Sequence, residues 1–220
     1  MRVTATRDNY TEIPDLIEFA LDTGVPKFCV YWLVPSGRGR DLHAERQLGS
    51  REIEKMLEAL YRKARELDPA TIEFLTVDAP QDAIYLLSTF QREDPPAYAS
   101  MRTLLKHLGV GCSTGDRIAN TDPSGNIYPC QFAQLEDLKI GNIRERRFSE
   151  IWNDPKSSVL SLFRTKSERV GGTCSSCSYR DACGGGCRIR AFAHNGDLRA
   201  EDPLRPLCSG KEDPLNRLRC

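Results

Sequence analysis

The sequence lacks the features of a membrane or secreted protein. Its longest apolar stretch, Phe28 to Pro35, is far shorter than the roughly 20 residues that cross a bilayer. Met1 to Asn9 contains no apolar core of a signal peptide, so we expect a cytoplasmic protein without a membrane partner. The 31 basic residues balance the 31 acidic residues, and no net charge therefore draws the chain towards nucleic acid.

Histidine is also scarce, whereas cysteine is abundant. The three histidines share no spacing, and we interpret them as surface residues. The nine cysteines are an odd number in a chain expected to stay reduced, which favours metal or catalytic use over disulfides. Cys29 stands alone and Cys220 ends the chain, while the other seven fall between Cys112 and Cys208.

Residues 1–110 alternate between strand and helix patterns. The expected strands are 2–6, 27–34 and 71–77, and the expected helices are 11–23, 50–67, 79–90 and 98–108. This alternation predicts an α/β unit with parallel strands and right-handed crossovers. A complete eight-stranded barrel takes about 250 residues. Residues 1–110 therefore fit only a partial (half) parallel β/α barrel or a small open sheet.

Several single residues in this chain have a structural interpretation. Ser50 is expected to cap the helix over 50–67, as Thr11 caps the helix before it. Asp78 follows a strand end, where a catalytic carboxylate can lie, but a helix cap before Ala79-Pro80 is the favoured interpretation. Cys29, Trp32 and Trp152 are expected to pack in the core.

Residues 111–220 are expected to form a small α+β module built around cysteines. The segment 122–125 (DPSG) is a β-turn, and the hairpin that it closes can return Cys130 towards Cys112. A C-x2-C-x5-C-x3-C run follows, and the last cysteine of the module comes after a gap: Cys174, Cys177, Cys183, Cys187 and Cys208.

Iron–sulfur clusters account best for these seven thiols. A cubane takes four thiolates, and the glycines at 184–186 let the backbone approach closely and point N–H groups at sulfur. Seven thiols can fill one cluster with four ligands and a second cluster with three. Structural zinc is the alternative, because C-x2-C pairs also bind zinc. Typical zinc modules carry two such pairs about 15–20 residues apart, whereas this chain has one true pair.

The cysteine spacing over residues 112–208 resembles the SPASM domain, the C-terminal extension of one large branch of radical SAM enzymes. The segments DPSGNIYPCQF at 122–132 and GNIRERRFSEIWND at 141–154 agree with this resemblance. Residues 9–39 resemble the later strands of the same family's barrel. The finer resemblance is to the branch related to alternative haem and haem d1 biosynthesis.

The resemblance implies two sets of ligands for one or two auxiliary [4Fe-4S] clusters. The first set, for auxiliary cluster I, is Cys112, Cys130 and Cys187, with a fourth iron site that cysteine does not fill. The second set, for auxiliary cluster II, is Cys174, Cys177, Cys183 and Cys208. The domain division that follows is a radical SAM-like partial barrel over 1–110 and a SPASM module over 111–220.

One motif of the family is missing. Radical SAM chemistry needs a C-x3-C-x2-C loop to bind S-adenosylmethionine, but only Cys29 precedes Cys112. We therefore expect that the chain from Met1 is a truncated or split form of a longer enzyme and does not cleave S-adenosylmethionine alone. The expected partners are an N-terminal radical SAM half or an electron-donor protein.

The substrate implied by the resemblance is a tetrapyrrole side chain or a peptide, modified by radical chemistry. Arg38, with Arg40, lies in a glycine-containing loop after a buried strand and is a candidate for the substrate or S-adenosylmethionine side. A solvated basic turn is the alternative for these arginines. The alternative function for the whole chain is a stand-alone iron–sulfur or zinc-binding electron carrier.

Overall fold

The computed structural model describes residues 1–108 and 111–204. Its first sheet has three parallel strands in the order β1 (Arg2–Ala5), β2 (Lys27–Trp32) and β3 (Glu73–Val77). Cys29 on the central strand lies opposite Arg2 on one side and Leu75 on the other. The parallel pairing confirms the α/β arrangement predicted from the alternating pattern.

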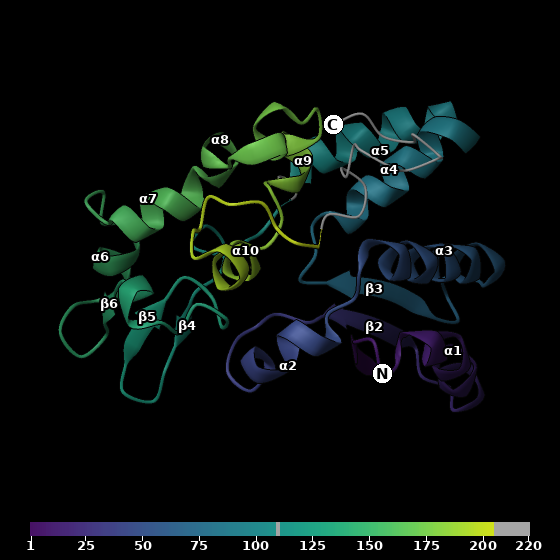
Figure 1. Ribbon diagram of the computed structural model, residues 1–220, viewed down its shortest axis with the longest axis horizontal. Helices are drawn as coiled ribbons and strands as arrows, with labels where there is room; N and C mark the ends of the chain where they lie inside the picture. Colours follow the sequence, from purple (N-terminus) through teal and green to yellow (C-terminus); the bar gives the residue numbers. More distant parts are fainter. Residues whose placement is uncertain (109–110, 205–220) are drawn as a thin grey trace.

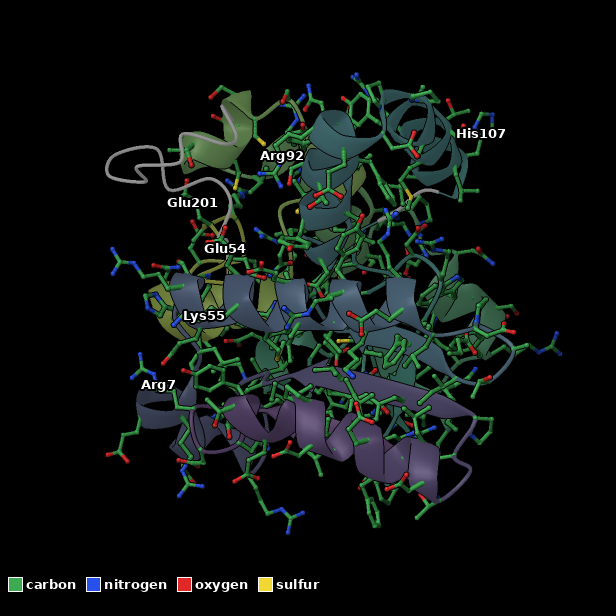
Figure 2. All side chains as sticks on the ribbon, turned by 90° about the vertical axis from the view of Figure 1, so that its right-hand side faces the viewer. Arg7, Glu54, Lys55, Arg92, His107 and Glu201 are labelled. Carbon is green, nitrogen blue, oxygen red and sulfur yellow. The ribbon has the colours of Figure 1, made fainter. Side chains whose placement is uncertain are left out.

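Two helices lie next to each other against this sheet. These are α1 (Ile13–Asp22) and α3 (Ser50–Glu66), and an ion pair between Lys63 and Glu18 joins them. In Figure 2, α3 runs across the middle of the molecule with α1 below it, and Lys55 marks its outer surface. Apolar side chains of the helices and of β2 form one core, which includes Ile17, Ile53, Leu57, Phe28, Val30 and Trp32.

Three predicted helix starts are wrong. Ser50 is the first residue of α3 rather than its cap, because Gly49 occupies the cap position, and the Glu52 carboxylate accepts a 2.6 Å hydrogen bond from the N–H of Gly49. Thr11 lies in a short 3-10 turn, η1 (Tyr10–Glu12), ahead of α1. Asp78 caps nothing, since α4 (Asp82–Glu93) begins four residues later and the backbone at Asp78 is left-handed, with φ of +70°.

The helices beyond β3 form a second layer. The α4 helix packs against α5 (Pro95–Leu108), with Leu87 and Leu105 buried between them. His107 points outward from α5, in agreement with the predicted surface position (Figure 2). A helix that the sequence pattern did not predict, α2 (Gly39–Arg46), follows the loop after β2. No helix within residues 1–108 and 111–204 combines the length and apolarity needed to cross a membrane.

The cysteine-rich part begins with the predicted hairpin. Its small antiparallel sheet has the order β4 (Asn120–Thr121), β5 (Asn126–Tyr128) and β6 (Gly141–Asn142). The Asp122 carboxylate accepts 2.9 Å hydrogen bonds from the N–H groups of Ser124 and Asn126 and so fixes the turn.

Short helices surround this sheet and continue to residue 204. They are η2 (Glu136–Leu138), α6 (Phe148–Trp152), α7 (Ser158–Arg164), α8 (Lys166–Arg169), η3 (Gly172–Ser176), α9 (Arg180–Cys183) and α10 (Arg188–Asn195). The prediction that Trp152 lies in the core is wrong, because its side chain is only partly buried. It stacks on the exposed ring of Phe148 at 5.7 Å between centroids and lies under Arg164, whereas Trp32 is 2 % exposed as expected.

The segments after β2 and β3 contact the cysteine-rich part directly. Val34 packs in the same buried cluster as Cys130 and Cys187, and the Ser36 hydroxyl donates to the carbonyl of Phe132 at 3.0 Å. Figure 1 shows α10 between the parallel sheet on one side and β4–β6 on the other. The carboxyl end of the parallel sheet, where such folds bind ligands, therefore faces the cysteines.

Candidate metal centre

Three cysteines from separate segments of the chain lie close together, and two of them contact one threonine. Cys112 Sγ lies 2.8 Å from the Thr114 hydroxyl, and the same hydroxyl hydrogen-bonds the Cys130 thiol. Cys112 is also close enough to Cys187 to act on it electrostatically. Cys130 and Cys187 share a buried core and are 2 % and 7 % exposed. The structure thus brings together the three thiols of the first predicted set.

The local sequence explains how these thiols meet. The hairpin returns the chain so that the N–H of Gly115 donates to the carbonyl of Pro129, one residue before Cys130. The return of Cys130 towards Cys112, predicted from the turn at 122–125, is therefore confirmed. Cys187 arrives from another direction, immediately after a glycine turn and before α10.

Three more cysteines form a second group. Cys174 lies in η3, Cys177 follows it, and Cys183 ends α9. The N–H of Cys177 donates to the carbonyl of Cys174 at 3.4 Å, and Cys174 acts electrostatically on Cys183. Cys208, the fourth member of this predicted set, lies outside the described residues, as does Cys220.

The glycine turn at 184–186 separates the two groups. Gly184, Gly185 and Gly186 all have left-handed backbones, with φ of +63°, +79° and +82°. Only glycine adopts such a run without steric cost. A Cβ on Gly185 would lie 2.8 Å from Val170 Cγ2, and one on Gly186 would lie 2.7 Å from Asp202 Cβ. The turn therefore requires these glycines, and it directs Cys183 and Cys187 into different groups.

The thiols fit a thiolate-binding metal or cluster. Burial raises the pKa of Cys183 and of Cys187 to about 12, so both are neutral thiols in the metal-free chain. The backbone N–H groups of Gly185 and Gly186 hydrogen-bond Cys183 and act on its pKa in the opposite direction. N–H groups aimed at sulfur stabilise thiolates, and a bound metal deprotonates its cysteine ligands.

The described residues form no ready-made site for a single metal ion. Within residues 1–108 and 111–204, no three cysteine, histidine or carboxylate side chains are placed to hold one ion. In a cubane, by contrast, each thiolate binds a different iron.

Other predicted site residues lie apart from these groups. Arg38 is exposed in the turn that precedes α2, after the end of β2. Cys29 is 6 % exposed on the central strand, in agreement with its predicted place in the core.

Sequence reasoning missed a buried ion pair next to Cys187. The Arg190 guanidinium donates to both carboxylate oxygens of Asp202, each at 2.8 Å, and also to the carbonyls of Leu33 and Asp78. Asp202 in turn accepts a 2.7 Å hydrogen bond from the N–H of Cys187. Nothing in the spacing of the two charged residues signals this pair.

Two carboxyl groups near the same end of the sheet have unusual environments. Burial raises the pKa of Asp82 to about 7, although Trp32 Nε1 donates a 2.6 Å hydrogen bond to it. Burial also raises the pKa of Asp78 to about 6, against the opposing effect of Arg190.

The sequence is similar to one domain family and to several named proteins. Residues 112–178 match the SPASM family model, described as an iron-sulfur cluster-binding domain. The chain is 31 % identical over 207 residues to pre-heme d1 synthase of Dinoroseobacter shibae, covering 92 % of this chain and 50 % of that protein. It is 30 % identical over 210 residues to Fe-coproporphyrin III synthase of Methanosarcina barkeri, covering 92 % and 51 %. It is also 26 % identical over 200 residues to the PqqA peptide cyclase of Xanthomonas euvesicatoria, covering 90 % and 47 %.

Solved structures share the fold. The structure of native anSMEcpe with bound AdoMet has a TM-score of 0.60 at 17 % identity and covers 92 % of this chain and 50 % of that one. Streptococcus suis SuiB bound to S-adenosylmethionine has a TM-score of 0.59 at 18 % identity, covering 91 % and 43 %. The chain spans about half the length of the curated relatives that it matches.

Proposed function

We propose that the chain is part of a radical SAM/SPASM enzyme and that it holds one or two auxiliary [4Fe-4S] clusters for radical-based modification of a substrate. The SPASM domain binds iron–sulfur clusters. In this proposal Cys112, Cys130 and Cys187 hold auxiliary cluster I. Cys174, Cys177, Cys183 and Cys208 hold auxiliary cluster II.

The proximity of Cys112, Cys130 and Cys187 carries this proposal. These thiols come from three separate segments, and the hydroxyl of Thr114 hydrogen-bonds two of them. A bound cluster would supply one-electron transfer at this position, beside the carboxyl end of the parallel sheet. The protein's own contribution is to bury the thiols and to aim backbone N–H groups at sulfur.

The domain division is part of the same proposal. Residues 1–110 are a partial β/α barrel and residues 111–220 are the SPASM module. The parallel order β1–β2–β3, with α1 and α3 packed side by side, supports the first half of this division.

The substrate is proposed to be a tetrapyrrole side chain or a peptide. The relatives named pre-heme d1 synthase, Fe-coproporphyrin III synthase and PqqA peptide cyclase support these two classes. Arg38, exposed after the carboxyl end of β2, is proposed to lie on the substrate side. The 220 residues contain no C-x3-C-x2-C loop, so we propose that a radical SAM half outside this sequence binds S-adenosylmethionine.

The missing loop also favours a second candidate, a stand-alone electron carrier or zinc module. Anaerobic reconstitution of the chain with iron and sulfide separates the two metals. About eight irons per chain correspond to two cubanes and about four to one. Zinc bound in place of iron, with no visible absorption from a cluster, would overturn the iron–sulfur proposal.

A further inference from the structure

Two arginines at the start of α10 are the largest fully buried side chains of the described protein. Arg188 is 1 % exposed and Arg190 is 0 % exposed, and both follow Cys187 closely in the chain. A guanidinium group is charged at every physiological pH. Each of these two buried cations therefore needs a compensating partner.

The two arginines differ in the groups that compensate their charge. Arg190 has the Asp202 carboxylate. Within the described part of the chain, Arg188 donates only to backbone carbonyls, those of Leu198 at 3.1 Å, Ala200 at 2.7 Å and Gly185. Among residues 1–108 and 111–204, Arg188 forms no ion pair, and its Nε atom is buried without a hydrogen-bond partner.

The carboxylate of Asp202 is already committed elsewhere. Its two oxygens accept hydrogen bonds from Arg190, from the N–H of Cys187 and from the N–H of Leu204. Carbonyl dipoles satisfy N–H donors, but they carry no net charge. The described chain therefore leaves a full positive charge uncompensated in its interior, which is unfavourable unless an anion is bound.

The position of Arg188 indicates which anion this is. Arg188 donates a hydrogen bond to the carbonyl of Gly185, which lies in the turn between Cys183 and Cys187. A Cβ on Gly185 would lie 3.0 Å from the Nη2 atom of Arg188. A second cation faces the same turn, because Lys166 Cε would lie 3.8 Å from a Cβ on Gly184. Lys166 is also close enough to Cys112 for an electrostatic interaction.

We infer that Arg188 is the counter-charge for an anionic, thiolate-bound iron–sulfur cluster at the 184–186 turn and raises its reduction potential. This inference rests on the proposed function. One-electron reduction adds a negative charge to the cluster, and a buried cation nearby stabilises the reduced form more than the oxidised form. Arg188 is thus a positioning and tuning residue and not a catalytic one.

A pair of variants separates charge from hydrogen bonding. Arg188→Gln removes the charge and keeps an N–H donor, whereas Arg188→Lys keeps the charge and loses the planar fork. Wild type and variants are reconstituted anaerobically as the full chain and reduced stepwise with dithionite, and the potential is followed by electron paramagnetic resonance. The control is Arg144→Gln, an exposed residue whose Nε donates only to the carbonyl of Ser124.

The expected result is a lower potential of at least one cluster in Arg188→Gln, with values near wild type for Arg188→Lys and Arg144→Gln. Equal potentials in all four proteins, or equal shifts in the Gln and Lys variants, would overturn the inference while leaving the clusters in place. A wild-type chain without iron would instead overturn the proposed function.

Urea unfolding of the metal-free chain tests the same inference when a variant binds no iron. Without the cluster, Lys at 188 remains an uncompensated buried cation, whereas Gln is neutral. The free energy of unfolding in urea should therefore be at least as large for metal-free Arg188→Gln as for Arg188→Lys. A clearly more stable Lys variant would contradict the counter-charge role.

Discussion

Arg190 and Asp202 form a two-point ion pair that is sealed from solvent, with side chains 0 % and 3 % exposed. The pair connects both parts of the chain, because Arg190 also donates to the carbonyls of Leu33 and Asp78, which follow β2 and β3. Asp202 accepts the N–H of Cys187. The position of a proposed cluster ligand is therefore tied to the carboxyl end of the parallel sheet by one buried pair.

Removing the acid from this pair should destabilise the protein strongly. Asp202→Asn leaves Arg190 buried without a counter-charge, which typically costs about 3–5 kcal/mol. Urea unfolding of the metal-free chain measures this loss. The matched control is Asp8→Asn, because the pair of Asp8 with Arg46 is exposed and should change stability little. A similar small loss in both variants would contradict the role given to the buried pair.

Asp82 should make the stability of the chain depend on pH. Burial raises its pKa in the folded protein to about 7, well above the usual value of 3.8 for an aspartate. The folded state therefore holds a proton that the unfolded state releases. Stability from this group is fully present below about pH 4 and is lost as the pH rises through about 7.

The variant Asp82→Asn should remove this dependence. We expect it to be more stable than wild type at pH 8, by on the order of a few kcal/mol, with the difference shrinking towards pH 5. Urea unfolding between pH 5 and about 8.5 measures both curves. Both proteins keep the smaller total change from Asp78, which ends at a lower pH because its pKa is raised only to about 6. Parallel curves for the two proteins would show that Asp82 is not the titrating group.

The glycine turn should not tolerate a side chain at 186. Gly186→Ala places a Cβ 2.7 Å from Asp202 Cβ on a left-handed backbone, so it adds a clash to the conformational strain. Gly196→Ala is the matched control, since φ there is +70° and nothing lies within 4 Å of the new Cβ. Thermal unfolding should show a loss of about 1–2 kcal/mol for the control and a larger loss for Gly186→Ala. Equal losses would mean that Asp202 moves away freely.

The two cysteine groups should lose iron independently. Cys130→Ala is expected to lose the cluster of the first group, and Cys177→Ala that of the second, about four irons each. Iron analysis and visible absorption after anaerobic reconstitution measure both losses, and Cys220→Ala should lose none. Loss of all iron in either single variant, or equal iron in the Cys177 and Cys220 variants, would contradict the division into two groups.

The local parts of the fold were predictable because their signals are local. The apolar run of β2 and the turn at 122–125 each depend on neighbouring residues, and both occur as expected. Helix starts were less predictable. Gly49 rather than Ser50 occupies the cap position of α3, and at Asp78 the chain makes a left-handed turn before α4 begins.

The parallel α/β unit and the hairpin follow from local patterns of residues, because periodicity and turn residues act over short distances along the chain. The burial of Arg188 and Arg190 depends instead on contacts between distant segments, since arginine is usually a surface residue. Their partners come from Leu33, Asp78 and the segment 198–202. No local sequence pattern predicts contacts between such distant residues. These contacts set the charge around Cys187.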